Sequence, residues 1–390
     1  MRPFVSRINL RHPAVIAAAV LALTLAAVPF LPDSGDEQGT ITPSSEEAGA
    51  PAPARTTSRG VVTPEMQAEI DRVVAAGAGL ATANGRVAAA GAAARCATFE
   101  GQRYCLGVGW TNKTPEEVAA TMAERPVPGR EHTGDLDADG VLARATSRSE
   151  KDRVRAEREE LTAAAEAVGK VWMLRHEIQG VPLPDGFAES HPEISARTFG
   201  ENHPKRFAIL KWWRTRAQNR TYWCGPATMQ AIGWGSSKKR RGQSVWARRL
   251  GTTSAGTGIT DMVRVVNGST RYDRKTYAGP YIALDISDFT FKQWYRLMMR
   301  HIHRYRAPVV MHPVLLKQYF PYLDDDASGH FQVGRGYHQN PRGNRKIGYF
   351  EPWDQSRFDP SEPTIDRVQW RNAYRSYRAN LDHFQHNLGV

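Results

Sequence analysis

The stretch QNRTYWCGPATMQ, residues 218–230, sets Cys224 between an aromatic pair and a Gly225-Pro226 pair. The residues that follow, ATMQAIGW, are typical of a helix, and proline is tolerated in a first helical turn. Cys224 is therefore expected at a helix N-terminus, where the partial positive charge favours a thiolate and lowers the pKa of the thiol. This predicts a nucleophilic cysteine. The alternative is a structural thiol that packs as a small hydrophobic residue.

Attack on a carbonyl group also needs a hydrogen-bond donor for the oxyanion that forms. Gln218 lies six residues before Cys224, and its side-chain amide can reach back to the carbonyl oxygen under attack. The backbone N–H of Cys224 is the expected second donor. The alternative for Gln218 is a solvated turn residue.

The other two cysteines, Cys96 and Cys105, stand nine positions apart in CATFEGQRYC. In an oxidising compartment this spacing predicts a local disulfide. A zinc site is disfavoured, because no second pair of ligands with suitable spacing lies nearby. Cys224 is then left without a partner within the chain.

The N-terminus indicates the compartment. Arg2, Arg7 and Arg11 precede an apolar run over residues 14–31. A basic stretch followed by such a run is typical of an export signal, and 18 residues also suffice to span a bilayer. We interpret residues 1–32 as a signal peptide or a membrane anchor. Both predict a protein that is secreted or held at the outer face of the cytoplasmic membrane.

Composition divides the rest of the chain. Residues 33–62 are rich in Ser, Thr, Pro, Gly and acidic residues and are predicted to be a disordered linker. Residues 63–195 are predicted to form a small, mostly helical domain that is stapled by the disulfide. Thr63 and Thr114 each precede a proline and are expected to cap helices. The apolar repeat within residues 146–180 predicts one long helix.

The second half changes character. Four runs rich in β-type residues, separated by turn signals, are predicted strands: RFAILKWW, YIALDI, HFQVGRGYH and KIGYFEPW. Helices are expected after Cys224 and in DFTFKQWYRLMMRHIHRY. A helix followed by an antiparallel sheet makes residues 200–390 an α+β domain.

Charge is unevenly distributed. Residues 1–194 carry 20 Lys and Arg against 26 Asp and Glu, whereas residues 195–390 carry 32 against 14. The basic half favours acidic substrates or anionic cell-envelope polymers. Nucleic acid is not an expected partner of an exported protein, so we interpret the KKRR run at 238–241 as a solvated turn. The charge difference also predicts that the acidic N-terminal domain docks on the basic domain.

Four stretches, in this order, resemble a known family: QNRTYWCGPATMQ, LGTTSAGTGITDMVRVV, GHFQVGRGYH and YFEPW. They are similar to the papain-like cysteine peptidases of the bacteriocin-leader-processing (C39-like) type, in an exported, stand-alone branch. The resemblance covers about residues 205–390. It implies a papain-like fold, in which an N-terminal catalytic helix packs on an antiparallel sheet.

The resemblance also implies roles for individual residues. Gln218 matches the oxyanion donor of the family, Cys224 the nucleophile, and His330 the base. Where the family has Asp-Pro, this chain has Glu-Pro at Glu351, and Asp354 follows shortly after. Either carboxylate is a candidate for orienting His330.

The sequence therefore predicts an exported cysteine peptidase that hydrolyses peptide or protein substrates without a metal or organic cofactor. A cell-wall peptide amidase or transpeptidase with the same chemistry is one alternative, and a non-catalytic envelope-binding module is another. Four further histidines are interpreted as ordinary surface or helix-face residues, although the HIHRY spacing also allows a metal site: His301, His303, His312 and His338.

Overall fold

A computed structural model of the chain describes residues 59–194, 202–274, 279–339 and 343–390. The predicted signal or anchor, and the predicted linker up to residue 58, lie outside these residues. Among the described residues, no helix combines the length and the apolarity that a bilayer crossing needs.

Ten strands within the described residues form one sheet. Its order is β1-β2-β3-β5-β10-β6-β7-β8-β9, with β4 paired to β7. Neighbouring strands are antiparallel except β3 and β5, which are parallel. The strands are β1 Cys96–Phe99, β2 Gln102–Cys105, β3 Gly109–Trp110, β4 Arg206–Ala208, β5 Ala283–Asp285, β6 Val309–Met311, β7 Gln332–Gln339, β8 Arg345–Phe350, β9 Val368–Asn372 and β10 Asn387–Gly389.

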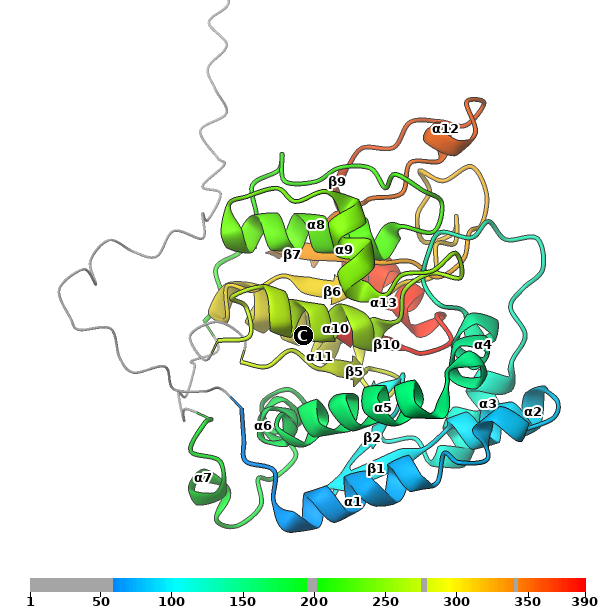
Figure 1. The fold of residues 1–390 in the computed structure, drawn as a ribbon. Coiled ribbons are helices and arrows are strands. Elements are labelled where there is room, and N and C mark those ends of the chain that lie inside the picture. Colours follow the sequence, from blue (N-terminus) through cyan, green and yellow to red (C-terminus); the bar gives the residue numbers. More distant parts are fainter. Residues whose placement is uncertain (1–58, 195–201, 275–278, 340–342) are drawn as a thin grey trace, which may run out of the picture. The chain divides into compact units, whose positions relative to one another are not determined.

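Helices flank this sheet along the whole described chain (Figure 1). A 3-10 turn precedes α2, and a π-helical turn over Arg300–Arg304 continues α11. The helices are α1 Pro64–Ala75, α2 Arg86–Ala93, α3 Pro115–Ala123, α4 Ala138–Ser147, α5 Glu150–Ala165, α6 Val168–Gln179, α7 Phe187–Ser190, α8 Cys224–Ser237, α9 Gln243–Leu250, α10 Ile259–Ser269, α11 Phe291–Met299, α12 Gln355–Phe358 and α13 Ala373–Leu381.

The mixed α+β class is confirmed, and so are both predicted helix caps. The hydroxyl of Thr63 accepts the N–H of Met66, and Thr114 forms a capping box with Glu117. The single helix predicted over 146–180 is wrong. The chain makes a turn between α5 and α6, and both helices bury apolar residues, so the apolar repeat continues across the turn and does not reveal it.

The two halves of the sequence contribute to the same sheet. Trp110 of β3 pairs with Leu284 of β5, and the Thr111 hydroxyl donates to the Asp285 carboxylate at 2.6 Å. The buried ammonium of Lys170 donates to the C-terminal carbonyl of Val390 at 2.9 Å. The predicted boundary between the two domains, near residues 195–200, lies outside the described residues. It therefore stays a prediction.

Helix α8 lies against β7 and beside α9 and α10 (Figure 1). One turn into the helix, the hydroxyl of Thr228 donates to the carbonyl of Phe331 at 2.9 Å. This hydrogen bond holds the first turn of α8 against the residue that precedes β7. The N-terminus of α8 and the start of β7 are thereby brought together.

Cys96 and Cys105 form a disulfide between the paired strands β1 and β2. The two cysteines are nine positions apart in the sequence, and their bridge restricts the unfolded chain. Replacing both by alanine is therefore expected to lower the free energy of unfolding by about 2–3 kcal/mol. Chemical denaturation measures this. Reductant should lower the stability of the unmodified protein to the level of the variant and leave the variant unchanged. Equal stability with and without reductant would contradict the prediction.

Candidate active site

Cys224 is the first residue of α8 and is fully buried as a free thiol. Burial and then the negative charge of Asp135 raise its pKa well above the ordinary value, although backbone N–H groups of Phe331 and Gly225 act to lower it. The predicted lowered pKa is therefore wrong for this arrangement. The helix N-terminus does favour the thiolate, but removal from water has the larger effect.

The Thr257 side chain packs closely against the first turn of α8. A Cβ atom at Gly225 would lie 2.6 Å from the Thr257 hydroxyl, so only glycine fits between Cys224 and the loop before α10. The N–H of Phe331 that acts on the thiol belongs to the residue after His330. The fold thus brings Cys224 close to His330, although the two residues are far apart in the sequence.

His330 lies two residues before the start of β7, and its side chain is fully buried. Its Nε2 lies 2.8 Å from Oε1 of Glu351. An ionised carboxylate only accepts hydrogen bonds, so Nε2 carries the proton and donates. Nδ1 is buried and has no hydrogen-bond partner among the described residues, which leaves its lone pair available.

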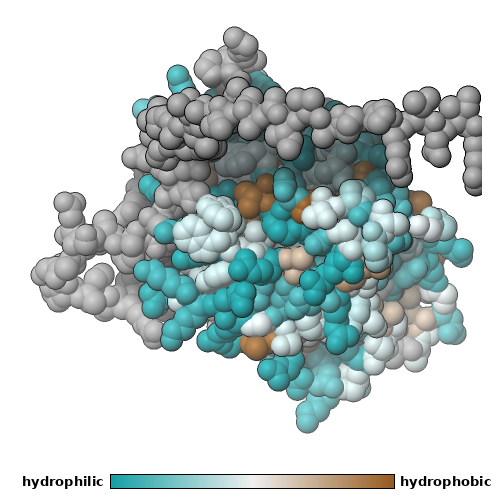
Figure 2. All heavy atoms as spheres, turned by 90° about the horizontal axis from the view of Figure 1, so that it is seen from above, coloured by the Kyte–Doolittle hydropathy of each residue, from teal (hydrophilic) through white to brown (hydrophobic). Residues whose placement is uncertain are grey.

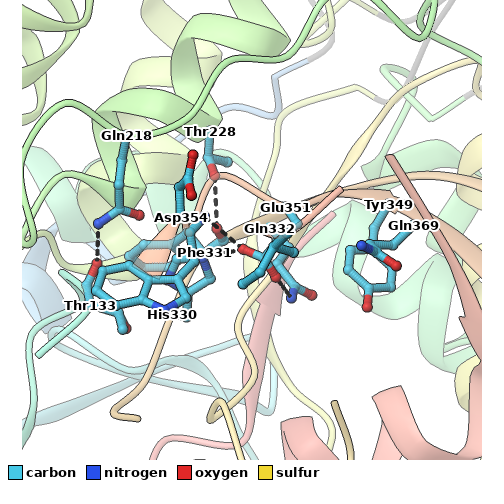
Figure 3. Close-up of polar contacts among 12 residues, drawn as sticks. Thr133, Gln218, Thr228, His330, Phe331, Gln332, Tyr349, Glu351, Asp354 and Gln369 are labelled. Atoms are coloured by element: carbon cyan, nitrogen blue, oxygen red, sulfur yellow. Dashed lines mark hydrogen bonds and ion pairs between the residues drawn. The ribbon is translucent and has the colours of Figure 1, made fainter. Parts of the chain in front are cut away.

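Glu351 follows the last residue of β8, and both of its oxygens are engaged. Oε1 also accepts the N–H of Trp353 at 2.9 Å, and Oε2 accepts from Tyr322 at 2.8 Å and Gln332 at 2.7 Å (Figure 3). Burial acts to raise the pKa of Glu351, but His330 and these donors outweigh it and lower the pKa. The carboxylate is therefore held ionised against the imidazole.

Asp354 lies in a different environment. It precedes α12, and its Oδ1 accepts a hydrogen bond from the Ser356 hydroxyl at 2.8 Å. The Arg367 guanidinium is 3.8 Å away. Of the two carboxylates that the sequence left open, Glu351 contacts His330, whereas Asp354 is directed to Ser356 and Arg367.

Gln218 is fully buried, and its backbone N–H donates to the carbonyl of Pro352 at 2.8 Å. This bond ties the loop before α8 to the residue after Glu351. Its Nε2 donates to the carbonyl of Thr133 at 3.0 Å (Figure 3) and also to those of Arg220 and Thr221. The amide nitrogen is thus directed at one carbonyl of a distant segment and at two carbonyls of its own loop.

Sequence reasoning missed a second buried cluster beside this site, formed by Asp135, His312 and His383. His312 was expected at the surface or on a helix face and is instead fully enclosed. The three residues come from separate segments and share no motif. No signal in the sequence connects them, because only the folded chain brings them together.

Residues 211–380 match the model of the Peptidase_C39 like family. The match supports a C39-like peptidase and spans Gln218, Cys224, His330, Glu351 and Asp354. Searches of curated proteins and of solved structures give no match.

Proposed function

We propose that the protein is a cysteine peptidase with a papain-like arrangement of Cys224, His330 and Glu351. His330 takes the thiol proton on Nδ1, and Sγ attacks the carbonyl carbon of a peptide bond. The Gln218 amide and the Cys224 N–H stabilise the resulting oxyanion. The amine leaves with the proton from His330, and water, deprotonated by His330, then releases the acyl group from sulfur.

One observation carries this proposal. The buried His330–Glu351 pair, joined at 2.8 Å, stands next to the N-terminus of the helix that begins with Cys224. Glu351 fixes the tautomer in which Nδ1 has a free lone pair. Nδ1 has no hydrogen-bond partner among the described residues, so its lone pair can take the thiol proton.

The direct test is cleavage of polypeptides. Purified protein is incubated with denatured polypeptides, and new N-termini are identified by mass spectrometry. We expect cleavage by the unmodified chain and none by Cys224→Ala. Cleavage by Cys224→Ala at the same rate, or no cleavage by either protein across a diverse set of polypeptides, would refute the proposal.

Gln218→Ala should lower kcat by about 10²- to 10³-fold, because one of two oxyanion donors is lost. Steady-state kinetics on a peptide identified by the cleavage experiment measures the effect. Gln243→Ala is the matched control, since Gln243 is buried near the same loop and accepts the Asn219 N–H without contacting the site. A similar loss in both variants would indicate disturbance of the loop instead of a lost oxyanion donor.

Export is part of the proposal, supported by the basic and apolar residues of 1–32 and by the disulfide. We place the protein outside the cytoplasmic membrane, secreted or anchored. The excess of positive charge in residues 195–390 favours a second candidate, a peptidase or transpeptidase acting on peptide stems of an anionic cell wall. Residues 238–241 are exposed. In the view of Figure 2, the surface that the grey residues leave visible is mainly hydrophilic. Incubation with peptidoglycan fragments distinguishes the two candidates.

A further inference from the structure

Residues 131–136, which bend at Gly134, lie beside the candidate active site, and we call them the cleft segment. On one side, Thr257 donates its N–H to the Gly134 carbonyl and accepts the N–H of Leu136, each at 2.9 Å. On the other side, Ser328 donates its N–H to the Glu131 carbonyl at 2.8 Å. Main-chain hydrogen bonds on both edges are how a groove binds an extended peptide.

The centre of the cleft segment lies against the reacting groups. The Thr133 carbonyl accepts from Gln218, and the Thr133 hydroxyl donates to the carbonyl of Gly329, the residue before His330. Gly134 has φ +118°, and a Cβ atom there would lie 2.5 Å from the carbonyl carbon of Tyr222. The segment therefore packs against Tyr222, two residues before Cys224, and the charge of Asp135 acts on the Cys224 thiol.

The next side chain of the segment enters a pocket of its own. Asp135 is buried, and its Oδ2 accepts a hydrogen bond from Nε2 of His383 at 2.8 Å. Nε2 of His312 lies 3.4 Å from the same oxygen. The His312 ring stacks on Phe331 at a centroid distance of 4.3 Å, so the pocket adjoins His330 directly.

His383 presents a hydrogen-bond donor to the carboxylate of Asp135. Nδ1 of His383 accepts the N–H of Gln385, so Nε2 carries the proton and offers a donor instead of a lone pair. Asn387 accepts from Nδ1 of His312 at 2.7 Å, so only a doubly protonated His312 ring also donates from Nε2 to the Asp135 carboxylate, which lies 3.4 Å away. Burial acts to raise the pKa of Asp135, but the two histidines outweigh it and lower the pKa strongly. The two histidines thus stabilise the ionised carboxylate of Asp135.

We propose that the pocket of His312 and His383 is a subsite of the peptide groove that binds an acidic side chain, and that the cleft segment fills this groove with Asp135 in the pocket. The inference rests on the proposed function, because it takes Cys224 as the reacting group beside the groove. Its consequence is that a substrate must displace the cleft segment. Peptides that carry an aspartate at the matching position compete best.

Binding is measured in a Cys224→Ala chain, so the result does not depend on catalysis. The probes are two fluorescent hexapeptides, EHTGDL, which copies residues 131–136, and EHTGNL. Their affinities are compared by fluorescence anisotropy in chains that also carry Asp135→Asn or, as the matched control, Asp185→Asn. Asp185 is exposed and lies far along the chain from the segment.

Asp135→Asn removes the carboxylate that holds the cleft segment in place. EHTGDL should therefore bind the Asp135→Asn chain about tenfold more tightly than it binds the Asp185→Asn control. EHTGDL should also bind about tenfold more tightly than EHTGNL, since the amide cannot replace the carboxylate. Equal affinities for the two peptides, or for EHTGDL in the two chains, overturn the proposal.

Thermal unfolding shows whether Asp135→Asn folds. If it does not, the two peptides are compared in the Cys224→Ala chain itself at higher concentration, where the aspartate peptide should keep its advantage. Equal binding there overturns the proposal as well. Absence of peptidase activity with a preserved preference for EHTGDL would instead refute the proposed function and leave the acidic subsite standing.

Discussion

His330→Gln is expected to lower kcat/KM for peptide hydrolysis by about 10³- to 10⁴-fold, because the general base for the thiol is lost. Glutamine is chosen because its amide can still donate to Glu351, as Nε2 of the imidazole does at 2.8 Å. The buried carboxylate of Glu351 then keeps a hydrogen-bond donor. A loss of activity therefore reflects the missing general base and not a disturbed fold. Steady-state kinetics on an identified peptide substrate measures the effect.

The control for this variant is His338→Gln, on the strand β7 that begins two residues after His330. His338 is only half-buried and pairs across the sheet with Arg206 and Lys346, away from Cys224. It should retain activity close to that of the unmodified chain. If both histidine variants lost activity equally, the imidazole of His330 would have no special role in the reaction.

Local motifs made part of the site predictable. Cys224 and Gln218 lie within seven residues of each other, and the Gly-Pro turn places the cysteine at a helix start whatever the rest of the fold does. Caps such as Thr63 and Thr114 are local in the same sense. Strand runs such as HFQVGRGYH carry enough β-type residues to predict β7, although the sequence does not say which strands become neighbours.

Features that depend on distant segments were not predictable. The pKa of Cys224 was predicted in the wrong direction because the fold buries the thiol and brings near it the charge of Asp135, which lies about 90 residues earlier in the chain. The choice between Glu351 and Asp354 depended on where β8 ends and which side chain then faces His330. The spacing of apolar residues in the sequence reveals neither the contacts between distant segments nor the side chain that faces His330.

The choice between these two carboxylates leads to the second large effect. Glu351→Gln should lower kcat by about 10³-fold, because the neutral amide still accepts from Nε2 but no longer stabilises the imidazolium that forms when His330 takes the thiol proton. The same substitution at the other position, Asp354→Asn, should leave kcat close to that of the unmodified protein, since Asp354 bonds to Ser356. Parallel kinetics on both variants measures the difference, and equal losses would contradict the assignment of Glu351.

Glu351→Gln should also destabilise the fold, by about 1–3 kcal/mol at pH 7. Glu351 accepts from His330, Trp353, Tyr322 and Gln332, so an amide NH₂ in its place must face at least one donor. Because the folded state lowers the pKa of Glu351, its stabilising contribution is full above the unfolded pKa of about 4.3 and disappears as the pH falls through the folded value. The difference in unfolding free energy between the two proteins should therefore be constant near neutral pH and shrink below about pH 4. Denaturant unfolding across this range measures it, and a difference that grew on acidification would mean that Glu351 is protonated in the folded protein.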